Sequence, residues 1–391
     1  MKIRYGRPFV RRISPGEGYF FFGYYDLPAF DPTGRFHLAH KVSFMDRLHV
    51  KGDKAQIGII EIETGKFEAL DITEAWNFQQ GAMLQWNPKA KGREIIYNRL
   101  EDGVYVGVIM DINTGKKRYT DYPVANVSSS GEYALGINMS RLYDFRPGYG
   151  YATIEDPFKN ENHPKEDGIF LTDMESGKGK LILSLQDIWD FSGGYFQGED
   201  QKMVINHITF NTDQSRFLFL PRNFPKPGER HKTAIITADK EGKDLFLLSD
   251  YGIQSHYHWK DKNTVIFFSD GKELKCRKGD LNTYELIDRT YEGRLIAEGA
   301  FTKDTHMSYS PDRKRLLMDT YPSKIGMRSL SIYDFEEDTQ IMLGSFYSMP
   351  VSCNDIRCDL HPRWNDTGSA VSFDSTHEGY RGIYMIDLED I

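Results

Sequence analysis

Four histidines stand at one place in a repeated motif. Each comes three residues before an aromatic residue that precedes a polar turn, in "HITF", "HYHW", "HMSY" and "HPRW", which begin at His207, His256, His306 and His361. Neutral imidazole is a common ligand for zinc, manganese or iron. Because four of the 11 histidines share this position, we interpret them as a functional cluster. The alternative is that each is a structural residue bonded to a neighbouring element.

The motif belongs to a unit that recurs seven times. In each unit a polar turn is followed by an apolar strand, a connection and a second apolar strand. The turns are "FDPTG", "WNPKAKG", "VSSSG", "FNTDQ", "WKDKN", "YSPDR" and "WNDTG". Most units begin roughly 40 to 55 residues apart, and an insertion at 146–167 lengthens the third. Strand-pair repeats of this length predict a β-propeller, whose blades bury their faces only when the ring closes.

The strands within the units are short and apolar. The first strands are "RFHLAHKV", "EIIYNRL", "EYALGINM", "RFLFLPRNF", "TVIFFSD", "RLLMDTYP" and "AVSFDST", and the partner strand of the fifth unit is "ELKCRKGD" at 273–280. The segment "LQDIWDF" predicts a helical turn on a connection. We therefore predict an all-β chain: one domain over 1–391, a seven-bladed β-propeller with four-stranded antiparallel blades.

Composition agrees with this fold and narrows the partners. Aromatic residues make up 14% of the chain, which favours strands. The net charge of -8 argues against nucleic acid as a partner. The three cysteines are too few for a disulfide framework. No membrane partner is expected, because the chain has no apolar run of 18 residues. The first residues lack the apolar region of a signal peptide, which predicts a cytoplasmic protein.

A propeller would bring the four histidines together. The innermost strand of each blade lines the central channel, so equivalent residues on successive blades lie at one height near the axis. Imidazoles that close would repel one another if protonated, so a metal or an anionic substrate is expected beside them. Cys358 precedes His361 by three residues and is either a further metal ligand or a buried apolar residue. Gln79 and Gln80 are either polar groups of the site or core amides.

Arginine and tyrosine residues supply candidate groups for binding an acidic sugar. Arg222 ends a strand that we expect to be the inner strand of unit four. It is either a surface charge or a bidentate clamp for a carboxylate. The segment "NMSRLYDFRPGYGYA" predicts either a wall of the site or a lid loop pinned by aromatic residues. The candidate substrate-binding residues here are Arg141, Arg146, Tyr149 and Tyr151, to which we add Gln80 and Arg363.

The repeated units resemble the oligogalacturonate lyase family. Longer blocks, including "FGYYD", "WNFQQGAMLQW", "RPGYGY", "SYSPDRKRLLMDTYP" and "RCDLHPRWN", are similar to propeller lyases that act on ulvan or on rhamnose–glucuronate linkages. The resemblance spans essentially the whole chain, although the short histidine motifs alone also occur in TolB-like propellers. It implies a seven-bladed propeller with an axial divalent metal held largely by histidine.

The resemblance further implies β-elimination at a uronate. A base removes the proton next to the carboxylate, an acid assists the leaving oxygen, and metal or arginine stabilises the developing charge. Carried onto this sequence, the catalytic residues are His207 as base, Tyr143 as acid (or the reverse pair) and Arg222 as the neutralising group. The implied metal ligands are His256, His306 and His361, with Cys358 as a further candidate. Manganese or zinc is the expected metal, with calcium as an alternative.

Tyr143 is a departure, because it stands where the family often carries histidine. If that histidine is the family's base, the chemistry of this chain is altered.

Two other functions stay open on the sequence. A glycoside hydrolase would need two carboxylates about 5 to 10 Å apart, and its candidates are Asp304, Asp319, Asp359 and Asp374. A non-catalytic binding propeller would use the histidines only for structure. The leading prediction is a polysaccharide lyase acting on a uronate-containing oligosaccharide.

Overall fold

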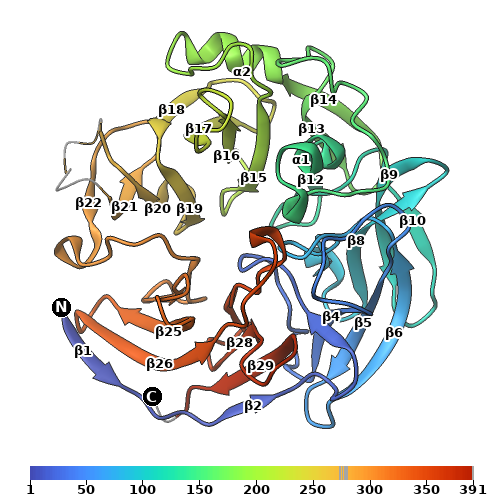
Figure 1. Ribbon diagram of the computed structural model, residues 1–391, viewed down its shortest axis with the longest axis vertical. Coiled ribbons are helices and arrows are strands. Elements are labelled where there is room, and N and C mark those ends of the chain that lie inside the picture. The colour runs from blue at the N-terminus through green and yellow to red at the C-terminus, as the bar shows by residue number, and fades with distance from the viewer. Residues whose placement is uncertain (273, 275, 277–280, 390–391) are drawn as a thin grey trace.

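Seven β-sheets are arranged around a central axis (Figure 1). This computed structural model describes residues 1–272, 274, 276 and 281–389. From the axis outwards, blade 1 holds β3 (Tyr19–Phe21), β4 (Phe36–Val42), β5 (Ala55–Glu61) and β6 (Lys66–Thr73). Blade 2 holds β7 (Gln85–Trp86), β8 (Glu94–Glu101), β9 (Val104–Asp111) and β10 (Lys117–Tyr119). Blade 3 holds β11 (Asn126–Val127), β12 (Tyr133–Gly136), β13 (Gly168–Asp173) and β14 (Gly179–Ser184).

The next three blades carry most of the histidine motifs. Blade 4 holds β15 (Val204–Phe210), β16 (Arg216–Asn223), β17 (Lys232–Asp239) and β18 (Phe246–Gly252). Blade 5 holds β19 (Gln254–Trp259), β20 (Thr264–Ser269), β21 (Asn282–Ile287) and β22 (Gly293–Leu295). Blade 6 holds β23 (Met307–Tyr309), β24 (Arg315–Asp319), β25 (Met327–Asp334), β26 (Thr339–Tyr347) and, as a fifth strand, β1 (Lys2–Tyr5).

Both ends of the chain contribute to blade 7, which closes the ring. It holds β27 (Arg363–Trp364), β28 (Ala370–Ser375), β29 (Gly382–Asp387) and, from the N-terminal segment, β2 (Val10–Arg12). β2 runs antiparallel to β29, and the two lie side by side in Figure 1. The sequence analysis had not assigned these first residues to a blade.

The blades are held together by apolar faces that pack on their neighbours. All seven residues of β15 and all eight of β16 are buried. Indole groups add hydrogen bonds between blades. The Nε1–H of Trp86 donates to the carbonyl of Ala29 at 3.2 Å, and that of Trp364 donates to the carbonyl of Ser308 at 3.2 Å. Each of these bonds links an inner strand to the blade before it, which fixes the height of the inner strands along the axis.

The predicted fold is confirmed, with local differences. The strands predicted as first and partner strands are mostly the second and third of each blade, and the short histidine motifs form the inner strands. The predicted partner strand at 273–280 lies largely outside the described residues; the third strand of that blade is β21. Arg222 lies on β16, the second strand of blade 4, because the inner strand is β15.

Two short helices sit on the connections. The helical turn predicted at "LQDIWDF" is α2 (Leu185–Ser192), which begins with a capping box between Ser184 and Asp187. The sequence analysis missed α1 (Met139–Phe145), which begins at the N-cap Asn138. Short 3-10 helices cover Pro88–Ala90, Pro147–Tyr149, Ile296–Gly299 and Asn354–Ile356. No helix among the described residues is long and apolar enough to cross a membrane.

Because β2 closes the ring, we expect deletion of both N-terminal strands to destabilise the protein more than deletion of β1 alone. Deleting residues 1–12 removes three paired positions of blade 7 and exposes the edge of β29. We expect the free energy of unfolding to fall by about 3 kcal/mol or more, at about 1 kcal/mol per lost hydrogen bond. Deleting residues 1–6 removes only β1, whose four residues are all exposed, and leaves the ring closed, so a smaller loss is expected because water replaces its hydrogen bonds. Chemical denaturation of both proteins measures the difference, and equal losses would contradict closure by β2.

Candidate active site

A cavity of about 890 Å³ opens at one end of the channel. Its wall is formed where inner strands begin and where second strands end. The segments at these places are 253–256, 302–304 and 320–323, together with Arg222, Asn354 and Arg357. Tyr24, Arg146 and Tyr149 complete this side of the wall. We call this space the reaction cavity.

Three of the four histidines form a row of contacting rings beside this cavity, with His306 in the middle. The ring centroids of His256 and His306 are 4.0 Å apart, and those of His306 and His361 are 4.3 Å apart. His207 lies apart from them, with its ring beside those of Tyr24 and Tyr25 at 4.8 and 5.8 Å. The channel thus brings the repeated positions together, but two tyrosines separate one histidine from the other three.

Three of these histidines each form a hydrogen bond to a carboxylate through one ring nitrogen. His207 bonds through Nε2 to Asp26 at 2.7 Å. His256 and His306 bond through Nδ1, to Asp304 and Asp319, at 2.9 Å in both cases. A carboxylate orients the ring and leaves the opposite nitrogen free for a proton or a metal. The free nitrogen is therefore Nε2 in His256 and His306, but Nδ1 in His207.

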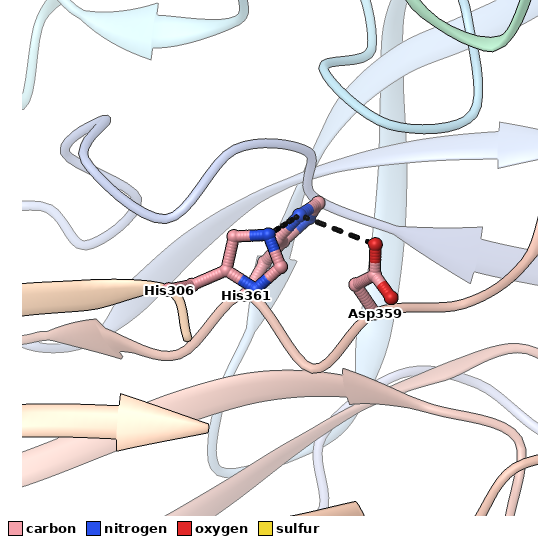
Figure 2. A group of neighbouring side chains, drawn as sticks. All are labelled: His306, Asp359 and His361. Atoms are coloured by element: carbon pink, nitrogen blue, oxygen red, sulfur yellow. Dashed lines mark hydrogen bonds and ion pairs between the residues drawn. The ribbon is translucent and has the colours of Figure 1, made fainter. Parts of the chain in front are cut away.

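His306, Asp359 and His361 form a group that is able to hold a metal ion (Figure 2). Their ligand atoms all lie within 4.8 Å of one another. The two Nε2 atoms are 3.2 Å apart, and His361 Nε2 is 3.9 Å from Asp359 Oδ2. Two nitrogen ligands at about 2.1 Å from one ion stand roughly 3.0 to 3.4 Å apart. The donor set and the spacing of the two nitrogens therefore fit a divalent cation.

The protonation state and the backbone conformation of His361 both bear on this candidate metal site. Burial, followed by the charge of His306, lowers the pKa of His361 well below its usual value, so its nitrogen keeps a lone pair at neutral pH. His361 has a left-handed backbone with φ 40°, and Met83, at the same place in the second unit, has φ 55°. Blades 2 and 7 thus share this left-handed turn, and blade 7 supplies histidine where blade 2 has methionine.

His256 and Asp304 form a polar pair on the cavity wall. Ser255 donates to Asp304 at 2.8 Å and steadies the carboxylate. Burial lowers the pKa of His256 to about 4, against the opposing effect of Asp304. Burial alone would raise the pKa of Asp304, but the charge and hydrogen bond of His256 lower it overall. At neutral pH His256 is thus a neutral imidazole that donates Nδ1–H to Asp304 and presents Nε2 as a base.

Arg222 is a buried cation on the same wall, only 5% exposed. It forms no ion pair or hydrogen bond through its side chain with any described residue, and its buried Nε lacks a partner. Burial, with the neighbouring charge of Arg146, lowers the pKa of Arg222. An unpaired guanidinium in such a place is costly unless a ligand supplies the missing negative charge.

Two other arginines of the wall, Arg146 and Arg357, have acidic or aromatic partners. Arg146 lies 3.5 Å from Asp355 and stacks over the ring of Tyr149 at 4.2 Å. Arg357 donates to the hydroxyl of Tyr149 at 2.9 Å and pairs with Asp359 at 2.7 Å. Arg146 and Tyr149 therefore lie where the sequence placed them, on a wall of the site.

Three other predicted residues are structural supports of the inserted segment. The guanidinium of Arg141 is buried against Asp156 at 3.1 Å and also donates to four backbone carbonyls. The hydroxyl of Tyr151 accepts a bond from Asn98 at 2.8 Å in the core. Tyr143 donates to the carbonyl of His49 at 3.1 Å and does not line the reaction cavity.

Three further predicted residues also lie off the cavity wall. Gln80 is buried, and its backbone N–H donates to Asn77 at 2.7 Å. Arg363 is buried beneath the wall, paired with Asp374 at 2.8 Å. Cys358 faces a separate, mostly apolar cavity, and burial raises the pKa of its thiol to about 11, which disfavours the thiolate that binds metal. The structure does not bring Cys358 into the His306–Asp359–His361 group.

Sequence reasoning gave no chemical role to Tyr321 and Arg357 and considered Asp304 and Asp359 only for hydrolysis. Both aspartates stand two residues before a histidine of the motif, in "DTH" and "DLH". This spacing was a usable signal for the carboxylates beside the imidazoles. Tyr321, which follows β24, lies with its ring 6.4 Å from that of His256. The loop after β24 places Tyr321 on the wall, and no repeated motif in the sequence marks this residue.

A scan against protein-family models finds no match, and no curated protein is similar in sequence. Solved structures are similar in fold. The oligogalacturonate lyase of Vibrio parahaemolyticus matches with a TM-score of 0.65 and 12% identity over 97% of this chain and 94% of its own. An oligogalacturonate lyase in complex with manganese matches with a TM-score of 0.68 and 14% identity over 97% and 93%.

The tricorn protease also matches, with a TM-score of 0.52 and 11% identity, over 96% of this chain and 34% of its own. At these identities the likeness shows the fold alone. It confirms the expected resemblance at that level: the chain shares the seven-bladed β-propeller fold of these oligogalacturonate lyases.

Buried Asp167, in the support of the inserted segment, predicts a pH-dependent stability. It shares the side-chain amide of Asn138 with Asp156, and burial raises its pKa to about 6. A carboxyl whose pKa is raised on folding binds its proton more tightly in the native state, so its stabilising effect is lost as pH rises from about 4 to 6. We expect the stability of Asp167→Asn relative to the natural protein to improve by about 2 kcal/mol between pH 4.5 and 7.5. Urea unfolding at both pH values measures this, and a constant difference would contradict it.

Proposed function

We propose that this protein is a polysaccharide lyase that cleaves a uronate-containing oligosaccharide by β-elimination with the help of a divalent cation. Arg222 is the observation that carries the proposal. Its unpaired, buried guanidinium calls for an anionic group in the reaction cavity, and the carboxylate of a uronate supplies one. In β-elimination negative charge develops on that same carboxylate, so Arg222 would stabilise the transition state.

His256 is the proposed base, whereas the sequence analysis expected His207 in that role. His256 lines the cavity and presents Nε2, because Nδ1 is fixed by Asp304. His207 is not on the wall; Tyr24 lines the cavity, and its ring packs edge to face against that of His207. A base must reach the proton that it removes, which favours His256.

A tyrosine hydroxyl on the wall is the proposed acid, in place of Tyr143. Tyr24 and Tyr321 both line the cavity. Burial raises the pKa of each well above its usual value, so both stay protonated at neutral pH and hold a proton for the leaving oxygen. Tyr321 is the nearer of the two to the base, because its ring neighbours those of His256 and His306.

The proposed cation is held by His306, His361 and Asp359, with manganese first and zinc as the alternative. A divalent cation there would supply positive charge to an acidic group bound in the neighbouring cavity. Asp319 keeps His306 Nδ1 engaged and also accepts the backbone N–H of His361 at 3.3 Å, so both imidazoles are oriented in advance.

The two other functions have less support. A hydrolase needs two carboxylates in the site, but Asp304 is the one acidic side chain among the described residues of the wall. Asp319, Asp359 and Asp374 are bound to His306, Arg357 and Arg363, respectively. A purely binding propeller remains the outcome if no turnover is found.

The first test is lyase activity on uronate oligosaccharides. We would follow the ultraviolet absorbance of unsaturated uronate with galacturonan, ulvan, rhamnogalacturonan and glucuronate-capped oligomers, each supplied with manganese. An increase is expected with at least one substrate. His256→Ala is expected to lower kcat by about 100-fold or more, the usual worth of a general base. His207→Ala is the matched control and should leave most of the activity.

Arg222→Lys refines the same test. A lysine keeps the charge but loses the two-pronged geometry, so a fall in kcat/KM of tenfold or more is expected. No absorbance change with any substrate, from a folded protein, would refute the lyase proposal. A reducing-end assay on the same mixtures would then separate hydrolysis from binding alone.

Metal content gives a prediction that does not depend on activity. Titration with manganese, followed by calorimetry, is expected to show one site whose affinity falls by at least tenfold in His306→Ala and in His361→Ala. Cys358→Ser should bind as the natural protein does, because its thiol faces another cavity. Equal affinity in all four proteins would place the metal elsewhere.

A further inference from the structure

A second cavity, of about 230 Å³, lies at the other end of the channel. Its wall includes Asn211 and Thr212, which follow β15, and Trp259, which ends β19. The reaction cavity is lined by residues at the opposite ends of these strands. The segment from Tyr24 to Asp26 separates the two spaces, because Tyr24 lines the first and Asp26 the second. We call the second space the far-end pocket.

Arg313 on its wall departs from the repeat. In six blades the fifth residue of the polar turn between the first and second strands donates its backbone N–H to the carbonyl three residues earlier. It is glycine at positions 34, 131 and 368, with φ between 70° and 72°. Blade 6 instead places Arg313 there, with φ 63°. A side chain in this left-handed conformation costs about 1 kcal/mol or more, which glycine avoids.

The side chain of Arg313 has no hydrogen-bond or ion-pair partner in the described part of the chain. Gln214, the other non-glycine residue with this conformation at the same place, uses its amide to bind Ser130 and Glu132 of the neighbouring blade. Arg313 makes no hydrogen bond or ion pair with any residue for which the structure gives side-chain contacts. Asp261, the acid that acts on it electrostatically, instead caps the backbone of its own turn. A partly buried cation is therefore left without a partner.

Trp259 departs from the repeat at the same pocket. The equivalent indoles of Trp86 and Trp364 donate to a carbonyl of the preceding blade. Trp259 is only 4% exposed, yet its Nε1–H has no acceptor within the described chain. An unsatisfied buried donor destabilises the protein unless something else accepts its hydrogen. The two departures thus leave one cation and one N–H donor at the wall of a single small space.

One further polar group of the pocket, His258, agrees with an acceptor ligand. His258 Nδ1 accepts the backbone N–H of Tyr309 at 3.4 Å, so a neutral His258 carries its proton on Nε2 and is a further donor. The carboxylate of Asp26 is engaged by His207 on its other side. We propose that the far-end pocket binds a small oxyanion, a phosphate or a carboxylate, through Arg313 and the indole N–H of Trp259. This site is separate from the reaction cavity and does not depend on the proposed lyase activity.

The indole resonance of Trp259 offers a direct test. In an amide-and-indole ¹⁵N spectrum of the full-length protein, Trp259→Phe identifies that signal among the five tryptophans. Sodium phosphate, acetate and galacturonate would be titrated separately at constant ionic strength, with chloride as the reference anion. We expect a saturable shift of the Trp259 signal with at least one oxyanion. The strongest binder tells whether the ligand is a phosphate, a simple carboxylate or a uronate.

Arg313→Gly is the critical variant, because glycine suits this turn in three other blades. Its melting temperature should not fall, while its affinity for the oxyanion should fall by about tenfold or more, the worth of a charge-assisted hydrogen bond. Gln214→Gly changes the equivalent turn of blade 4 and should bind as the natural protein does. Arg313→Gln serves if the glycine variant does not fold. No saturable shift with any oxyanion, or unchanged affinity without Arg313, would overturn the proposal.

Discussion

A blade of this propeller has two apolar faces and is able to bury them only against its neighbours. That requirement closes the ring, and it draws the N-terminal strand β2 into the last blade beside β29. Closure also sets the inner strands at a common height, so residues at one repeat position meet at the axis. The contact between His256, His306 and His361, which are far apart in sequence, is a direct consequence of blade packing. The chemistry of the site therefore depends on an apolar interaction that takes place around it.

Carboxylates then give the equivalent histidines different roles. Asp304 and Asp319 hold Nδ1 of His256 and His306, whereas Asp26 holds Nε2 of His207. One repeat position thus holds residues with different roles. His256 lies on the cavity wall with Nε2 free, His306 is a candidate metal ligand through Nε2, and His207 is buried behind Tyr24. Evolution of function on a repeat fold requires only such changes of partner, because the backbone already provides the convergence.

The parts of the structure that the sequence predicted are those that the repeat specifies. Blade number, strand pairs and the contacts among three of the four histidines all follow from one periodic pattern of apolar residues and turns. His207 shares that pattern but is set apart by two tyrosines, and most of the other residues that were placed imprecisely lie outside it. Arg141 and Tyr151 look like sugar-binding residues by composition, but the inserted segment needs them to satisfy its own buried polar groups. Cys358 is close to His361 in sequence, yet its side chain points into a different cavity.

Departures from the repeat carry a different kind of information. A residue that matches its equivalents is explained by the fold, whereas one that differs at some energetic cost needs another reason. Met83 and His361 share a strained backbone, so the strain alone indicates nothing about function. The presence of histidine at this position in blade 7 is the informative difference. By the same reasoning Arg222 stands out, because its buried charge has no partner among the described residues to justify it. The folding of the ring gains nothing from such a group, and a bound anion gives it a physical reason to be there.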